Sequence, residues 1–299
     1  MSPWSCHAPI SLARRVWLMQ ANRQPNSNRQ RRSEMAQDKE TVQTSPKQPG
    51  IWKTSFVAIL RCWASTVIVA ILMLAMAFWQ FAAPFSGQVY VIYVLGLVIW
   101  GYFALSLFAW LLNGYAGIAA FKEFDASRVR LFSGRYIVLQ LLDTLPASLG
   151  LFVLTGHFML SPEDMAKIEN LSAIGISSIF TFVSLWIVLV FFATLLPAAL
   201  IGDGSGVGRA VARGRKTVWY VTGRVMLGPV LMLFLGSMIV NLVQTAGGQP
   251  LISSDGALAF NATSVITMVV SSLQYIVIGA MIVVIVSRAY HLGEKRLTV

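Results

Sequence analysis

Six stretches of the chain are almost continuously apolar, and polar segments separate them. They cover residues 56–81, 89–112, 136–158, 174–201, 225–243 and 265–287. Each has close to or more than the roughly 20 residues that a helix needs to cross a hydrocarbon core of about 30 Å. Because a single span in lipid can satisfy its backbone hydrogen bonds only as a helix, the pattern predicts an all-α, polytopic membrane protein with about six transmembrane helices.

The connections between these stretches alternate in their content of Lys and Arg. Ten basic residues lie in the chain up to Arg61, four between 122 and 135, five between 209 and 224, and three after the last stretch. The intervening connections hold one at most. Because Lys and Arg are enriched in cytoplasmic loops, the alternation predicts that both termini lie in the cytoplasm.

Three regions follow from the same pattern. Residues 1–52 are rich in Gln, Ser, Pro and Arg, which predicts a disordered basic cytoplasmic tail. Residues 53–290 are the predicted six-helix transmembrane domain, and residues 291–299 are a short cytoplasmic tail.

The start of the tail allows three interpretations. It has no Asp or Glu before residue 34, as is typical of organelle transit peptides. It is alternatively an ordinary cytoplasmic tail, or an unused upstream start. We favour the last, in which residues 1–34 are not translated and Met35 is the first residue.

Composition supports a membrane location and weakens the case for nucleic acid. Hydrophobic residues make up 56% of the chain and charged residues only 12%, unlike an ordinary soluble domain. A net charge of +11 would suggest a nucleic-acid partner in a soluble protein. Here the basic residues flank apolar spans, so the cytoplasmic bias of Lys and Arg explains them, and we expect no nucleic-acid partner.

The sequence predicts no catalytic centre, cofactor, metal site or disulfide. The glycine-rich segment 202–208 and the Gly-Arg-Lys-Thr segment 214–217 do not have the spacings of nucleotide-binding loops. Neither the G-x-S-x-G pattern of hydrolases nor a metal-binding HExxH or CxxC pattern is present. Cys6 and Cys62 are not spaced as a framework. We therefore expect a protein that is not an enzyme.

A few polar residues fall within the predicted spans, where an ionisable side chain is costly unless it meets water or a partner. The candidate cluster consists of Arg61, Gln140, Asp143 and Gln274. One interpretation is structural, with an ion pair between Arg61 and Asp143 and small polar stripes that let helices pack. The alternative is a polar path through the bundle, as in a transporter or permease subunit. A lipid-modifying enzyme would need a second acid, base or metal ligand near Asp143, and none is evident.

The two basic connections combine cations with aromatic and aliphatic residues, which suits short helices lying in the membrane interface. Their candidate contacts to anionic headgroups are Lys122, Arg128, Arg130, Arg135, Arg209, Arg213, Arg215, Lys216 and Arg224. The alternative is that these residues only mark where spans end.

In the segment with Pro197, Ala198, Asp203, Ala210, Arg213, Gly214, Arg215 and Trp219, a span ends near a proline and a basic amphipathic stretch precedes the next span. This segment resembles a recurring segment in the six-helix membrane domain of glycerophosphoryl diester phosphodiesterases and of related small bacterial membrane proteins. A serine is common there where this chain has Gly214, and these 299 residues include no soluble phosphodiesterase domain. The resemblance implies a helical bundle of the bacterial plasma membrane without the enzymatic activity of the larger members.

These observations favour a non-enzymatic protein of the bacterial inner membrane that acts as a scaffold or in envelope maintenance. We expect its basic connections to contact anionic lipid or a cytoplasmic protein partner. A transporter or permease subunit is the alternative.

Overall fold

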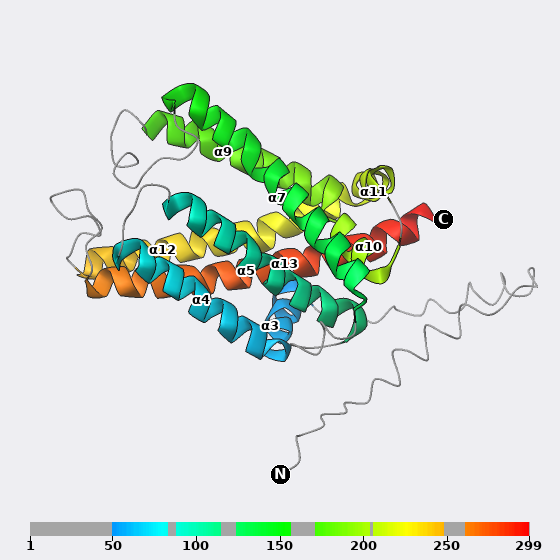
Figure 1. Cartoon of the computed structure of the whole chain (residues 1–299), viewed down its shortest axis with the longest axis horizontal. Coiled ribbons are helices and arrows are strands. Elements are labelled where there is room, and N and C mark those ends of the chain that lie inside the picture. The colour runs from blue at the N-terminus through cyan, green and yellow to red at the C-terminus, as the bar shows by residue number, and fades with distance from the viewer. Residues whose placement is uncertain are drawn as a thin grey trace, which may run out of the picture. The chain divides into compact units, whose positions relative to one another are not determined.

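The computed structural model describes residues 50–82, 88–114, 124–156, 171–203, 206–247 and 261–298. Within these ranges all regular structure is helical, as predicted (Figure 1). The elements are α3 (Ile51–Arg61), α4 (Trp63–Ala82), α5 (Gln88–Asn113), α7 (Ala126–Thr155), α9 (Leu171–Ile187), η2 (Val188–Phe192), α10 (Leu195–Ile201), α11 (Val207–Val225), η3 (Met226–Val230), α12 (Leu231–Gly247) and α13 (Ala262–Leu297), where η marks a π-helical segment. Positions 1–49 of the predicted tail, residues 1–52, lie outside the described residues.

Five continuous helical segments are long and apolar enough to cross a membrane, or six if a bent pair counts as one span. The bent pair is α3 and α4, which meet at Cys62 at an angle of 87°. The Thr66 hydroxyl donates to the carbonyls of Cys62 at 3.1 Å and of Ile59 at 3.4 Å, and so provides a partner for backbone oxygens at the break. The first predicted span, 56–81, is therefore not one straight helix.

α3 lies against α5 and α13 instead of extending α4. Its buried residues are Ile51, Ser55 and Ala58, which recur at helical spacing. The indole of Trp52 donates to the carbonyl of Leu227 at 3.3 Å, and the Arg288 guanidinium donates to Thr54 Oγ1 at 2.6 Å. α3 is thus fixed to the same end of the bundle as the ends of α11 and α13.

Where the structure describes them, both basic connections are largely helical and continuous with the spans that follow them. α7 begins at Ala126 instead of 136, because Asp125 caps its first turn by accepting from the Ser127 backbone N–H at 3.3 Å and from its hydroxyl at 2.6 Å. α11, η3 and α12 run together from Val207 to Gly247. The sequence predicts separate short interfacial helices in this region. The structure instead shows helices that continue into the spans.

The π-helical segment η3 explains how α11 and α12 remain one helix although Pro229 lies between them. Proline lacks a backbone N–H and disturbs the regular α-helical hydrogen bonds. It lies inside η3, and such a π-helical turn shifts the hydrogen-bond pattern without ending the helix.

α13 is the central helix and contacts α3, α4, α5, α11 and α12. It runs alongside α12 (Figure 1). It extends past the predicted end at 287 to Leu297, so most of the predicted tail, 291–299, is helical instead.

α7 and α9 form a second pair, seen as the two green helices at the top of Figure 1. α9 continues through η2 and α10 as far as Ile201. Gly202, with a φ of +80°, ends α10 in the left-handed conformation that glycine adopts without steric cost. The chain then enters α11, which packs against η2 and α13.

Candidate functional site

α11 separates its basic residues onto different faces. Its buried residues are Ala210, Arg213, Gly214, Thr217, Val221 and Val225. Their spacing of three to four residues places them on the face that lies against η2 and α13. Arg213 is consequently directed into the bundle, and none of its side chain is exposed.

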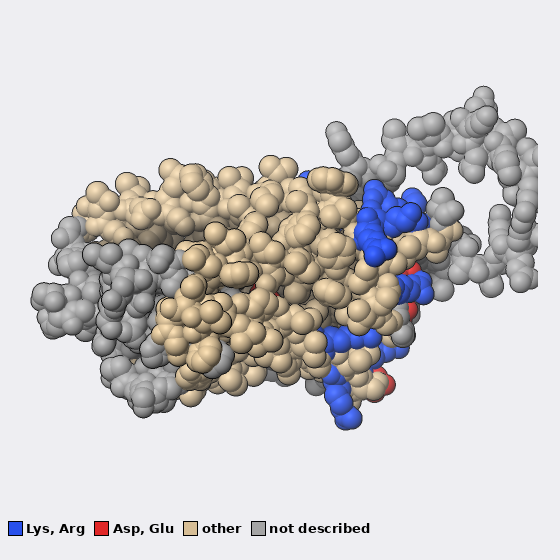
Figure 2. All heavy atoms as spheres, turned by 90° about the horizontal axis from the view of Figure 1, so that it is seen from above, with Lys and Arg blue, Asp and Glu red and all other residues tan. Residues whose placement is uncertain are grey.

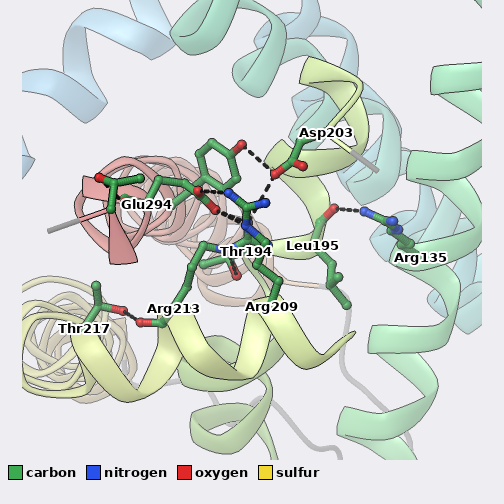
Figure 3. A network of polar contacts seen from close by, with 10 residues as sticks. Arg135, Thr194, Leu195, Asp203, Arg209, Arg213, Thr217 and Glu294 are labelled. Carbon is green, nitrogen blue, oxygen red and sulfur yellow. Dashed lines mark hydrogen bonds and ion pairs between the residues drawn. The ribbon is translucent and has the colours of Figure 1, made fainter. Parts of the chain in front are cut away.

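The Arg213 guanidinium contacts two carboxylates (Figure 3). Its Nη1 lies 2.6 Å from Glu294 Oε1 on α13 and 3.4 Å from Asp203 Oδ2 in the turn after α10. Its Nε donates to Thr194 Oγ1 at 3.3 Å, and its Cζ lies 4.8 Å from the centroid of the Tyr290 ring. A buried charge is costly unless it is paired and hydrogen-bonded, and these four groups fulfil that condition for Arg213.

Each carboxylate also has a second partner. Arg209 binds Glu294 in a bidentate manner, with Nε 3.1 Å from Oε1 and Nη2 2.5 Å from Oε2. The Tyr290 hydroxyl donates to Asp203 Oδ2 at 3.1 Å. Two arginines thus face two carboxylates, and their formal charges cancel. We define the arginine network as Thr194, Asp203, Arg209, Arg213, Tyr290 and Glu294. This network joins α11 to the end of α13 and to the turn after α10.

Two arginines of α7 bind backbone carbonyls of α10. Arg135 Nη1 donates to the Leu195 carbonyl at 2.8 Å, and Arg128 Nη1 donates to the Leu200 carbonyl at 3.4 Å. Leu200 belongs to the last turn of α10, where carbonyls lack partners within the helix and a nearby cation interacts favourably with the helix dipole. Leu195 is the first residue of α10, so Arg128 and Arg135 hold α7 against both ends of α10.

Four of the nine candidate headgroup contacts therefore donate hydrogen bonds within the protein: Arg128, Arg135, Arg209 and Arg213. Arg213 is excluded as a headgroup contact, because it is fully buried. Arg130, Arg215, Lys216 and Arg224 are exposed, and Lys122 lies outside the described residues. Figure 2 shows Lys and Arg gathered at one end of the molecule, while the rest of the described surface in that view carries almost none.

The structure does not bring the four residues of the predicted intramembrane cluster together. Arg61 is exposed at the end of α3, beside the bend. Gln274 donates from α13 to the carbonyls of Met232 and Leu233, both at 3.2 Å, and so joins α13 to α12. Gln140 and Asp143 line a cavity elsewhere. The predicted ion pair is not formed, since Asp143 Oδ1 is buried without a hydrogen-bond partner.

The cavity has a volume of about 440 Å³ and lies between α5, α7, the segment from α9 to α10, and α13. Its wall is mostly apolar and aromatic. Its polar groups are few, with Asp143 and Gln140 on α7 accompanied by Tyr93, Tyr136 and Tyr275. Tyr93 is tied to α7 by a hydrogen bond of 2.9 Å between its hydroxyl and Thr144 Oγ1.

The carboxylates of the arginine network, Asp203 and Glu294, are not among the candidate site residues predicted from the sequence. Asp203 falls in a glycine-rich segment, and Glu294 falls in the predicted tail. One signal was available for Glu294, because the helical spacing of Val286, Ala289 and Gly293 continues the buried face of α13 past residue 287.

Comparison with protein-family models, with curated proteins and with solved structures finds no match to this chain. The resemblance to the membrane domain of glycerophosphoryl diester phosphodiesterases therefore stays a prediction. Among the described residues, no group of three or more His, Cys, Asp or Glu side chains is placed to hold a metal ion.

Proposed function

We propose that the chain is a non-enzymatic protein of the bacterial inner membrane, with both termini in the cytoplasm, whose α11 contacts anionic lipid headgroups as part of a membrane scaffold. The observation that carries the proposal is the outward face of α11. Arg215 and Lys216 are exposed there beside Trp219, which is 84% exposed. We call these three residues the basic face.

The chemistry of the basic face suits the boundary between headgroups and acyl chains. Trp is enriched at that depth, because its ring is apolar and its N–H is polar. Each Lys or Arg near an anionic surface contributes on the order of 1 kcal/mol to binding. Arg296 of α13 donates to the Lys216 carbonyl and brings another cation close to the face. The arginine network fixes the opposite side of α11, so the basic face is held outward.

Native mass spectrometry of the purified chain, titrated with phosphatidylglycerol or phosphatidylcholine, tests this proposal. The wild type is expected to retain phosphatidylglycerol preferentially. With about 1 kcal/mol for each of two charges, the double substitution Arg215→Gln/Lys216→Gln is expected to weaken that retention roughly 30-fold.

The matched control conserves charge. Arg215→Lys/Lys216→Arg keeps both cations and is expected to retain phosphatidylglycerol as the wild type does. Equal retention by the neutral variant would overturn the proposal. Recovery of one protein by crosslinking from position 219, with no lipid preference, would favour a cytoplasmic partner instead.

A permease subunit is the second candidate function, and the cavity beside Asp143 favours it. A polar group within an apolar bundle is typical of a substrate site near the middle of the membrane. Solute uptake compared between a deletion strain and its complemented parent tests this candidate. Uptake that is equal across a broad panel of solutes would count against it.

A further inference from the structure

The wall of the cavity between α5, α7 and α13 combines one carboxylate with several aromatic rings. Asp143 is the only charged residue among the described residues that line it. The aromatic side chains include Tyr93, Trp100, Tyr136 and Tyr275, which come from all three helices. A negative charge surrounded by aromatic faces is complementary to an organic cation, because both the carboxylate and the ring quadrupoles attract positive charge.

Asp143 has one carboxylate oxygen that lacks a donor within the described part of the protein. Its Oδ1 is buried and has no hydrogen-bond partner. A buried acceptor without a partner is unfavourable, and more so if it is charged. Thr144 follows Asp143 in the sequence, but its hydroxyl is already hydrogen-bonded to the Tyr93 hydroxyl at 2.9 Å. A ligand that donates a hydrogen bond to Oδ1 would remove this cost.

We propose that the cavity binds a lipophilic amine, a molecule with a protonated amino group on an apolar body. The ammonium group donates to Asp143 Oδ1, and the apolar body lies against the aromatic and aliphatic wall. The volume of about 440 Å³ falls in the range of about 300–1,000 Å³ that small-molecule sites occupy. Tyr275 lines the cavity and is 50% exposed, so the site adjoins the outer surface of the bundle. Binding here depends neither on the basic face nor on transport.

Anionic and strongly polar ligands do not match this wall. An anion would be repelled by Asp143, and no Lys, Arg or His among the lining residues offsets that repulsion. A sugar would bring more hydroxyl groups than the few polar side chains could satisfy. The apolar wall and single carboxylate favour one cationic group on a hydrophobic body.

The test uses the full chain in nanodiscs and equilibrium dialysis against three probes with the same apolar body. These are 1-naphthylmethylamine, the neutral 1-naphthylmethanol, and 1-naphthoate, and empty nanodiscs correct for partition into lipid. The proposal predicts saturable binding of the amine, at least tenfold weaker binding of the alcohol, and none of the carboxylate. Asp143→Asn is expected to weaken amine binding at least tenfold.

A pair of glycine substitutions locates the site without altering Asp143. Gly96 lines the cavity, and a Cβ added there meets nothing within 4 Å, so the side chain in Gly96→Leu would project into the open space. Gly175 is exposed on α9, does not line the cavity, and has equally open surroundings. Gly96→Leu is expected to abolish amine binding and Gly175→Leu to leave it unchanged. Equal binding of amine and alcohol, equal effects of the two leucines, or no saturable amine binding would each overturn the proposal.

Discussion

Arg213 of α11 and Glu294 of α13 are joined by an ion pair of 2.6 Å, although 81 positions separate them in the sequence. Arg213 belongs to a segment whose cations, judged from the sequence, face lipid headgroups. The structure instead assigns it a role inside the bundle, where its partners come from α13 and from the turn after α10. The same helix thus carries a buried structural arginine and, on its outer face, Arg215 and Lys216.

Removing one partner of this pair is expected to destabilise the protein. Arg213→Gln leaves Glu294 and Asp203 short of a cation, and loss of one member of a buried pair costs about 3–5 kcal/mol. Because about a fifth of the Glu294 side chain is exposed, we expect the lower end of that range. Thermal unfolding in detergent measures the effect. The exposed Arg215→Gln is the control and should change stability by about 0.5 kcal/mol or less; equal losses in both variants would contradict this prediction.

Gly214 allows α11 to approach η2 closely. A Cβ at this position would lie 2.5 Å from the Val190 carbonyl oxygen and 2.9 Å from the Phe191 Cα, which are backbone atoms that cannot move aside alone. Gly214→Ser is expected to cost about 1–3 kcal/mol. Gly208→Ser is the matched control, because a Cβ there meets nothing within 4 Å. Unfolding measurements that show no difference between the two serines would contradict the close packing.

The cap of α7 gives stability a dependence on acid pH. The Ser127 hydroxyl donates to Asp125 and holds the pKa of that carboxyl below its ordinary value of 3.8. A lowered pKa means that the cap stabilises the folded state fully above that value and that its contribution is lost as the pH falls through the folded pKa. Asp125→Asn keeps an acceptor that does not titrate. We expect the stability of the wild type relative to Asp125→Asn to fall on acidification below about pH 4, measured by thermal unfolding; a constant difference would contradict this assignment.

α13 is long enough for its two ends to lie on opposite sides of a membrane, and the accessibility of residues near each end tests this. Its 36 residues rise about 54 Å at 1.5 Å per residue, so Thr298 lies far from Ala246, which is near the start of α13 at the end of α12. With Cys6 replaced by serine and Cys62 buried, an impermeant maleimide is expected to label Ala246→Cys in intact cells. It should label Thr298→Cys only after permeabilisation. The reverse result would contradict cytoplasmic termini.

The sequence predicted the helical class and most span centres because apolar stretches of this length have few other solutions in lipid. It did not predict the bend at Cys62, where neither proline nor glycine marks a break. The inward direction of Arg213 was in principle visible, since Ala210, Thr217 and Val221 lie on its face at helical spacing. The concentration of five cations in this segment favoured a headgroup role for all of them, because charge alone does not distinguish the buried face of a helix from its exposed face.

The cavity could not be predicted in the same way. Asp143 was recognisable as an unusual residue in a span, and its helical face included Gln140. Whether that face met a partner or an open volume depended on how α5 and α13 pack against α7, which no local pattern encodes. The expected partner, Arg61, lies on a helix that the bend at Cys62 separates from α4.

The division of α11 into a buried and a lipid-facing set of cations is tested most directly by measuring thermal stability and phosphatidylglycerol retention on the same two variants. Arg213→Gln is expected to unfold at a lower temperature. Arg215→Gln/Lys216→Gln is expected to unfold like the wild type and to lose its preference for phosphatidylglycerol. If the outer pair lowered stability as much as Arg213→Gln does, or left lipid retention unchanged, the two faces of α11 would not have the separate roles proposed for them.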